Sequence, residues 1–171
     1  TGAQQQHFAG SQILAELERA SMKEGLQFIE ELVFENGAVY RGYLKDGTRH
    51  GPGTQVWPDG ARYEGEWRLN KANGRGKFWH ADGDVYEGLW EDDKANGYGV
   101  YVHVNGAKYE GYWRNDLQDG QGVESWSDGS RYEGGYKEGM KHGRGLYVWN
   151  DQSKYDGDWF ENKINGVGFY E

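Results

Sequence analysis

The sequence predicts an all-β repeat array of antiparallel β-hairpins, preceded by a short α-helix. Three observations carry this prediction. A tyrosine recurs every 23 residues, a G-x-G pair recurs with the same step, and an Asn-Gly or Asp-Gly pair recurs in phase with both. A fixed period without insertions is the signature of a repeat protein, in which one supersecondary unit stacks on the next.

Six copies follow this period. The recurring tyrosines are Tyr40, Tyr63, Tyr86, Tyr109, Tyr132 and Tyr155. Each is followed two residues later by a glycine. Two residues further on lie Leu44, Trp67, Trp90, Trp113, Tyr136 and Trp159. Each copy therefore contains two short strands, and twelve strands at about 4.8 Å spacing give an array about 55 Å long.

Side-chain alternation assigns a face to each residue of the motif. In Tyr63-Glu64-Gly65-Glu66-Trp67, the tyrosine, glycine and tryptophan share one face, and the two glutamates lie on the other. A glycine beside aromatic residues leaves a slot in which a ring from a neighbouring strand lies flat. We therefore expect most of the repeated tyrosines and glycines to be scaffold, and the repeated glutamates to form a solvated acidic face.

The two connections in each copy are expected to differ. Asp-Gly or Asn-Gly between alternating strands predicts a type I′ hairpin turn, since both of its central residues need a positive φ. The other connection, for example residues 68–73, reads as a longer polar loop. Gln152 replaces the turn glycine of the last such turn, which predicts either local strain or a different turn there.

Residues 1–39 lie largely outside the repeats. We expect a disordered tail over 1–10, a helix over 11–25 and a half-repeat cap strand over 26–39, with the array over 40–171. Ser11 is a plausible N-cap and Gly25 a natural stop, and the helix is about 21 Å long. Its apolar stripe comprises Ile13, Leu14, Leu17 and Ala20. Three roles remain open: a cap on the sheet edge, a lid in the chain's own groove, or a helix for dimerisation or partner binding.

Composition excludes several classes of function. The 171 residues carry a net charge of −9 and no cysteine, and no apolar run is long enough to span a bilayer. No basic stripe runs along the chain, so we expect no nucleic-acid partner. His80 and His103 stand one repeat apart, about 9–10 Å, which is too far to share a zinc ion. We expect a soluble cytoplasmic protein with no metal, no cofactor and no catalytic residues in this chain.

The motifs resemble the MORN (membrane occupation and recognition nexus) repeat, as in Tyr63-Glu64-Gly65-Glu66-Trp67 with Asn73-Gly74-Arg75-Gly76. The resemblance covers about residues 36–171. Leu44 and Tyr136 depart from it where tryptophan is usual. It implies an extended, twisted single sheet with a groove along one face. It also implies a non-catalytic scaffold or adaptor that holds helical or extended segments of partners, often cytoskeletal or motor proteins near membranes.

The aromatic side chains on the glycine face suggest where such a partner binds, because tyrosine and tryptophan are the commonest interface hot spots. The acidic charge favours a basic partner segment. The candidate groove residues are Trp67, Trp90, Tyr101, Trp113, Trp126, Tyr136, Trp149 and Trp159.

Two alternatives remain beside the scaffold. The basic region 41–77 suggests a module for phosphoinositide membranes, provided that its cations share a face. Its candidate contacts are Arg62, Arg68, Lys71, Arg75 and Lys77. The other alternative is an oligomerisation element, with a homodimer as its simplest form. The chain begins without Met and ends inside a strand pattern, so we expect a longer parent protein, in which a catalytic domain would be invisible here.

Overall fold

The structure is a computed structural model that describes residues 15, 16, 19 and 24–171. The predicted tail over 1–10 lies outside the described residues. Ala15, Glu16 and Arg19 have helical backbone, but the residues between and around them are outside the description, so the helix over 11–25 stays a prediction. Gly25 has φ +74°, the left-handed conformation that commonly ends a helix.

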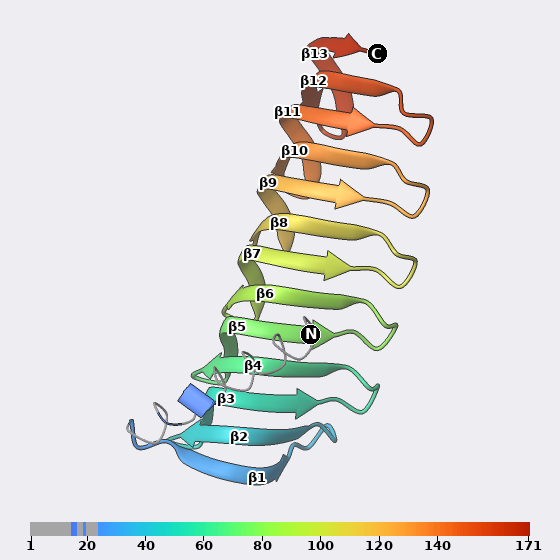
Figure 1. The fold of residues 1–171 in the computed structure, drawn as a ribbon. Helices are drawn as coiled ribbons and strands as arrows, with labels where there is room; N and C mark the ends of the chain where they lie inside the picture. Colours follow the sequence, from blue (N-terminus) through green and yellow to red (C-terminus); the bar gives the residue numbers. More distant parts are fainter. Residues whose placement is uncertain (1–14, 17–18, 20–23) are drawn as a thin grey trace.

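Residues 27–170 form one open antiparallel sheet of 13 strands, and each strand pairs with its neighbours in the sequence (Figure 1). The all-β hairpin array is thus confirmed. The strands are β1 (Gln27–Val33), β2 (Val39–Lys45), β3 (Thr48–Val56), β4 (Arg62–Arg68), β5 (Lys71–Trp79), β6 (Val85–Glu91), β7 (Lys94–Val102), β8 (Lys108–Arg114), β9 (Leu117–Ser125), β10 (Arg131–Lys137), β11 (Met140–Val148), β12 (Lys154–Phe160) and β13 (Lys163–Tyr170).

The repeated tyrosines are the most deeply buried large side chains of the described chain. Tyr63 is 1% exposed and its ring lies over Gly76 of the next strand, where a Cβ would stand 2.2 Å from the tyrosine Oη. The hydroxyl donates a hydrogen bond to the carbonyl oxygen of Glu66 at 2.8 Å. Equivalent bonds form at the other five tyrosines. The slot expected beside each glycine is therefore present. We call this side of the sheet the tyrosine face and the other side the opposite face.

Tryptophans join one repeat to the next on the tyrosine face. The ring of Trp67 packs edge-on against Tyr63 of its own repeat at 5.0 Å and against Tyr40 of the preceding repeat at 5.7 Å. Its Nε1 donates to the carbonyl oxygen of Gly53 at 3.1 Å. Each repeat therefore completes its small core only when a neighbour is present, as in other linear arrays.

The strands bend sharply where the glycines pair. Gly65 pairs with Gly76 and Trp67 pairs with Ala72, so Glu66 alone faces three residues of β5. The middle one, Gly74, has φ +92°. In Figure 1 the strands curl backward at the end remote from the Asn-Gly and Asp-Gly turns. This bulge increases the local bend and twist, and it gives the flat sheet a folded cross-section.

The turn prediction was wrong at both connections. At Asp59-Gly60 only the glycine has a positive φ, +92°, and its N–H donates to the carbonyl oxygen of Trp57 at 3.0 Å. This is a three-residue loop that ends in a left-handed glycine. The type I′ turn lies instead at the other connection, where Leu69 and Asn70 have φ of +47° and +70°. The cross-strand pair Arg68 and Lys71 leaves only these two residues in the loop.

Gln152 adopts the same turn as its glycine counterparts. Its φ is +71° and its N–H donates to the carbonyl oxygen of Trp149 at 2.9 Å. Of the two expected outcomes, the turn is therefore unchanged, and the side-chain-bearing residue sits in the left-handed region at a conformational cost of about 1 kcal/mol.

We predict that Gly76→Ala destabilises the protein by about 1–3 kcal/mol, because the new methyl overlaps the ring of Tyr63. Chemical denaturation of the variant measures the loss. In a Tyr63→Ala background the same change should cost much less, since the clashing ring is gone. Equal costs in both backgrounds would show that the ring is not the cause.

We predict that Gln152→Gly raises the free energy of unfolding by about 1 kcal/mol, while Gly129→Gln lowers it by a similar amount. Gly129 is the matched control because it has φ +90° in the equivalent turn and no atom within 4 Å of a built Cβ. Thermal melts of both variants test this. Shifts of the same sign would contradict it.

Candidate binding surface

The tyrosine face carries two further lines of rings beside the buried tyrosines. Cross-strand pairing places Phe78 beside Tyr63 and Tyr101 beside Tyr86. Nearer the three-residue turns, Trp57 packs on Phe78 at 5.6 Å, and Trp126 stacks on Tyr147 at 5.6 Å. The rings of the outermost line are Phe34, Trp57, His80, His103, Trp126 and Trp149.

All eight predicted groove residues lie on the tyrosine face, but they differ in exposure. Trp67, Tyr136 and Trp159 are 5–7% exposed and belong to the repeat cores. The other five are partly exposed: Trp90, Tyr101, Trp113, Trp126 and Trp149. These five are therefore the predicted groove residues that remain accessible from solvent, while the first three pack within the repeat cores.

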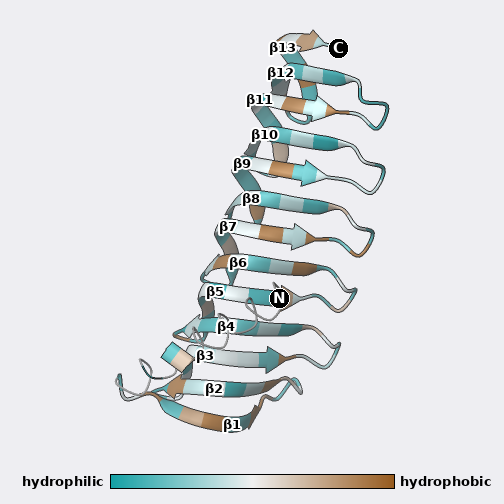
Figure 2. Ribbon diagram, viewed as in Figure 1, coloured by the Kyte–Doolittle hydropathy of each residue, from teal (hydrophilic) through white to brown (hydrophobic). Residues whose placement is uncertain are grey.

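Hydropathy does not mark this surface. Figure 2 shows broad hydrophobic stretches in β1, whereas many of the other strands are hydrophilic to intermediate in colour. Tyrosine, tryptophan and glycine all score near the middle of such scales, although an aromatic ring buries a large apolar area on contact. The aromatic lines, not hydropathy, define the candidate surface.

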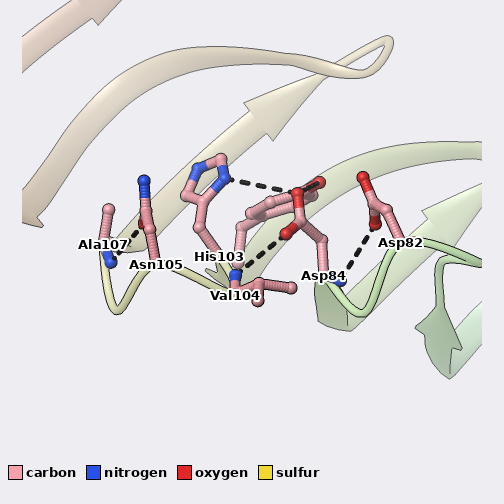
Figure 3. A network of polar contacts seen from close by, with 7 residues as sticks. Asp82, Asp84, His103, Val104, Asn105 and Ala107 are labelled. Carbon is pink, nitrogen blue, oxygen red and sulfur yellow. Dashed lines mark hydrogen bonds and ion pairs between the residues drawn. The ribbon is translucent and has the colours of Figure 1, made fainter.

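A polar junction interrupts the outermost line in its middle (Figure 3). Asp84 accepts a hydrogen bond from the Tyr101 hydroxyl at 2.8 Å and one from the backbone N–H of Val104 at 2.9 Å. The same carboxylate lies 3.3 Å from Nδ1 of His103. The bond from Val104, with that from Tyr101, holds the pKa of Asp84 below its usual value. Asp84 therefore supplies a fixed negative charge to the tyrosine face.

Sequence reasoning missed this junction, although the signal was available. The position of Asp84 is Ala or Ser in the other repeats, and that of His103 is an aromatic ring in most of them. Burial, and next the hydrogen bond to Asp84, raises the pKa of the Tyr101 hydroxyl. Tyr101 thus stays a neutral hydrogen-bond donor, which fixes its ring in the surface.

Two cations are folded into the tyrosine face where the motif tryptophan is missing. Leu44 pairs with Arg49, and Tyr136 pairs with Lys141. The Arg49 guanidinium lies 4.4 Å from the Trp67 ring centre. Trp67 and Trp90 pair with the small Ala72 and Ala95, whereas Trp113 pairs with Gln118 and Trp159 with Ile164.

The ammonium of Lys141 lies among four rings, with its nearest contact to Trp126 at 5.3 Å. Desolvation lowers the pKa of Lys141, and the charge of Glu124 opposes this shift. Glu124 also accepts a hydrogen bond from Tyr136 at 2.6 Å. The tyrosine face near β9–β12 therefore contains a half-buried cation among aromatic rings and a carboxylate of opposite sign that is hydrogen-bonded to Tyr136.

The five cations proposed as lipid contacts share the opposite face. Cross-strand pairs place Arg62, Arg68 and Lys71 there, together with Arg75 and Lys77. Acidic residues lie between them: Arg62 lies 2.5 Å from Glu64 and Lys77 lies 3.7 Å from Glu87. This surface carries mixed charge and is not a continuous basic patch.

The opposite face also contains a groove of about 650 Å³, which sequence reasoning did not locate. Its walls include Phe28, Leu89 and Tyr98 together with charged side chains, and paired glycines lie along its floor. Because each strand bends toward the tyrosine face at those glycines, side chains on the opposite face splay apart. Side-chain alternation along the strands places these residues on one face of the sheet. It does not predict the bend of the strands, on which the groove depends.

Within the part of the chain that the structure describes, no three His, Asp or Glu side chains gather to hold a metal ion. None of those described residues forms a helix that is long and apolar enough to cross a membrane.

The open sheet and its stacked hairpins define a linear β-hairpin repeat protein. The model of the MORN repeat matches residues 40–62, 63–85, 86–108, 109–131, 132–154 and 155–171. The chain therefore belongs to the MORN repeat family.

Two solved structures are similar to this chain. One is the wild-type TCP10 domain of Danio rerio CPAP in complex with a STIL peptide, at 15% identity and TM-score 0.42, with 74% of this chain and 52% of that chain covered. The other is the SAS-4 (dCPAP) TCP domain of Drosophila melanogaster with a proline-rich motif of Ana2, at 14% identity and TM-score 0.44, covering 85% and 88%. The chain thus spans about half of the first structure. No curated protein matches it.

We predict that alkaline pH unfolds the array. Burial raises the pKa of the Tyr132 hydroxyl to about 12 and raises the pKa of Tyr63 and Tyr109 well above the usual value. An unfolded phenol ionises near pH 10, so the free energy of unfolding should be unaffected below that pH and fall between about pH 10 and 12. Tyrosinate absorbance should rise together with loss of the sheet circular dichroism. Complete titration near pH 10 with the sheet intact would refute this.

Proposed function

We propose that this chain is a non-catalytic scaffold that holds a helical or extended segment of another protein along the tyrosine face. The observation that supports this most is the surface of partly exposed rings on the tyrosine face, which no second layer of the described chain covers. Exposed aromatic surface of this kind is typical of a partner site, and tyrosine and tryptophan dominate interface energetics.

The charge of the chain favours a basic partner. The net charge is −9, and the tyrosine face itself contributes the carboxylate of Asp84. Complementary charge speeds association and selects among partners more than it adds affinity. A segment with spaced Lys or Arg and with apolar side chains between them fits the surface best. The family resemblance supports a cytoplasmic setting, with a cytoskeletal or motor-associated partner near a membrane.

A phosphoinositide-binding module is the second candidate. It is favoured by the shared face of Arg62, Arg68 and Lys71, and it is weakened by the acidic neighbours of that face. Each lysine or arginine near an anionic membrane contributes about 1 kcal/mol, and each interleaved glutamate opposes it. A homodimer remains a third arrangement, which light scattering would measure.

We predict that Trp126→Ala/Trp149→Ala weakens partner binding about tenfold or more, because both rings lie partly exposed at the open side of the tyrosine face. The probe is a peptide selected on the wild-type protein from a random display library, and calorimetry measures its affinity. Asp84→Asn should weaken a basic peptide less, and the loss should shrink at high salt.

The matched control is Tyr112→Ala, which removes a 52% exposed ring from the opposite face. It should leave peptide affinity within about twofold of wild type. If it weakens binding as much as the tryptophan pair does, the tyrosine face is not the site. Flotation of the wild type with vesicles that contain phosphatidylinositol 4,5-bisphosphate, together with selection of no peptide, would favour the membrane alternative.

A further inference from the structure

The rings around Lys141 form an aromatic cage that holds a cation of the chain itself. The ammonium lies 5.3–6.0 Å from four ring centres, and Lys141 is partly exposed, so the cage is open to solvent. The negative faces of such rings attract a cation, most strongly at tryptophan. We call this set of rings the Lys141 cage; its members are Trp126, Tyr132, Tyr147 and Trp159.

Three repeats earlier, the same four positions again carry aromatic rings, but the lysine is absent. Ala72 stands at the position of Lys141, so this position supplies no ammonium. We call this second set the Ala72 cage; its members are Trp57, Tyr63, Phe78 and Trp90. The two sets differ in composition by one ring, a phenylalanine in place of a tyrosine.

The rings have the same spacing in both cages. Trp57 and Phe78 lie 5.6 Å apart, and Phe78 and Trp90 lie 6.1 Å apart. Tyr63 and Trp90 lie 5.4 Å apart. The equivalent distances in the Lys141 cage are 5.6, 6.0 and 5.4 Å. Because Trp57, Phe78 and Trp90 are partly exposed, an ammonium from another molecule can approach their rings from the solvent side.

A carboxylate lies beside the Ala72 cage. Asp93 accepts a hydrogen bond from the backbone N–H of Ala72 at 2.7 Å. Burial is the main cause of the raised pKa of the Tyr63 hydroxyl, and the charge of Asp93 also contributes to it. In the Lys141 cage the equivalent of Asp93 is the neutral Asn162. The Ala72 cage therefore has a negative charge next to it and, among the described residues, no cation over its rings.

The neighbouring repeats do not offer the same combination. In the preceding repeat the Arg49 guanidinium already lies over two rings, 5.0 Å from Phe34 and 4.4 Å from Trp67. In the following repeat His80 stands at the position of Trp57, and an imidazole is a poorer cation binder than an indole. An external cation is therefore best accommodated at the Ala72 cage.

We infer that the Ala72 cage binds the ammonium group of a lysine side chain from the partner segment. This inference rests on the proposed function for the presence of a partner, and it adds which side chain is recognised and where. Lysine is the expected occupant because rings of the same spacing already hold a lysine ammonium in the Lys141 cage. Asp93 provides the complementary charge.

Titration with n-butylammonium chloride tests the cage without a partner, because this probe has the amine and the alkyl chain of lysine. The indole N–H resonances of Trp57 and Trp90 should shift in the wild type, and n-butanol should shift them less. In Lys141→Ala, the resonances of Trp126 and Trp159 should shift as well, because that cage has lost its own ammonium. No shift at Trp57 or Trp90 up to about 100 mM probe would overturn the inference, whatever Lys141→Ala does.

The matched variant is Trp67→Tyr/Ala72→Lys, which reproduces the tyrosine and lysine of the Lys141 repeat. Its own lysine should abolish the shift at Trp90, whereas Trp67→Tyr alone should retain it. A shift that persists in the double variant, with the sheet intact by circular dichroism, would contradict the inference. Trp57→Ala removes a partly exposed ring and should also abolish the shift at Trp90, so the test remains decisive if the double variant does not fold.

A peptide selected on the wild-type protein separates this inference from the proposed function. Replacing one of its lysines by norleucine should weaken binding about tenfold or more, and Trp67→Tyr/Ala72→Lys should weaken it similarly. If only Trp126→Ala/Trp149→Ala weakens binding, the proposed function stands and the cage is not the lysine site. If no peptide is selected, the proposed function fails, and the n-butylammonium titration still decides whether the cage binds an ammonium.

Discussion

The fold depends on one contact that is repeated six times: a tyrosine ring lies across a glycine of the next strand. At Tyr63 the ring occupies the space that a Cβ on Gly76 would take, and its hydroxyl closes a bond to the carbonyl of Glu66. The ring thereby fills the inside of the bend that the bulge creates. Ring, glycine and bend need one another, and all six copies keep the 23-residue spacing without an insertion. The single sheet gains a core without a second layer.

The tryptophan position shows how tightly that core is filled. A tryptophan pairs with alanine at Trp67 and at Trp90, whereas Leu44 and Tyr136 pair with Arg49 and Lys141. The long cation occupies volume that the missing indole leaves, and its charge rests on neighbouring aromatic rings. The pairing is not a strict rule, because Trp113 pairs with Gln118 and Trp159 pairs with Ile164. Neither Leu44 nor Tyr136 is a weak copy of the motif, because each has a compensating partner.

Sequence reasoning recovered what parity and period control, and it failed where geometry depends on the bend. Alternation assigned Tyr63 and Trp67 to one face correctly, and the period gave the strand count. The two turn types were assigned to the wrong connections. Strand register decides that Asp59-Gly60 lies in a three-residue loop and that Leu69-Asn70 forms the two-residue turn, and the bulge between β4 and β5 sets that register. Local composition favoured Asp-Gly for the tight turn. The groove was missed for the same reason, since splayed side chains beside Gly65 follow from curvature and not from alternation.

Function is expected at the positions that do not repeat. A side chain present in every copy, such as Tyr63, is explained by packing, so it cannot by itself select a partner. Asp84 is different: its equivalents are Ala or Ser, so the fold does not require its carboxylate. The same argument holds for Leu89 and Tyr98, whose equivalents further along the chain include Asp158 and Arg144. One uniform scaffold can thus carry two distinct surfaces, because the residues that differ between repeats are not fixed by the packing of the repeat cores.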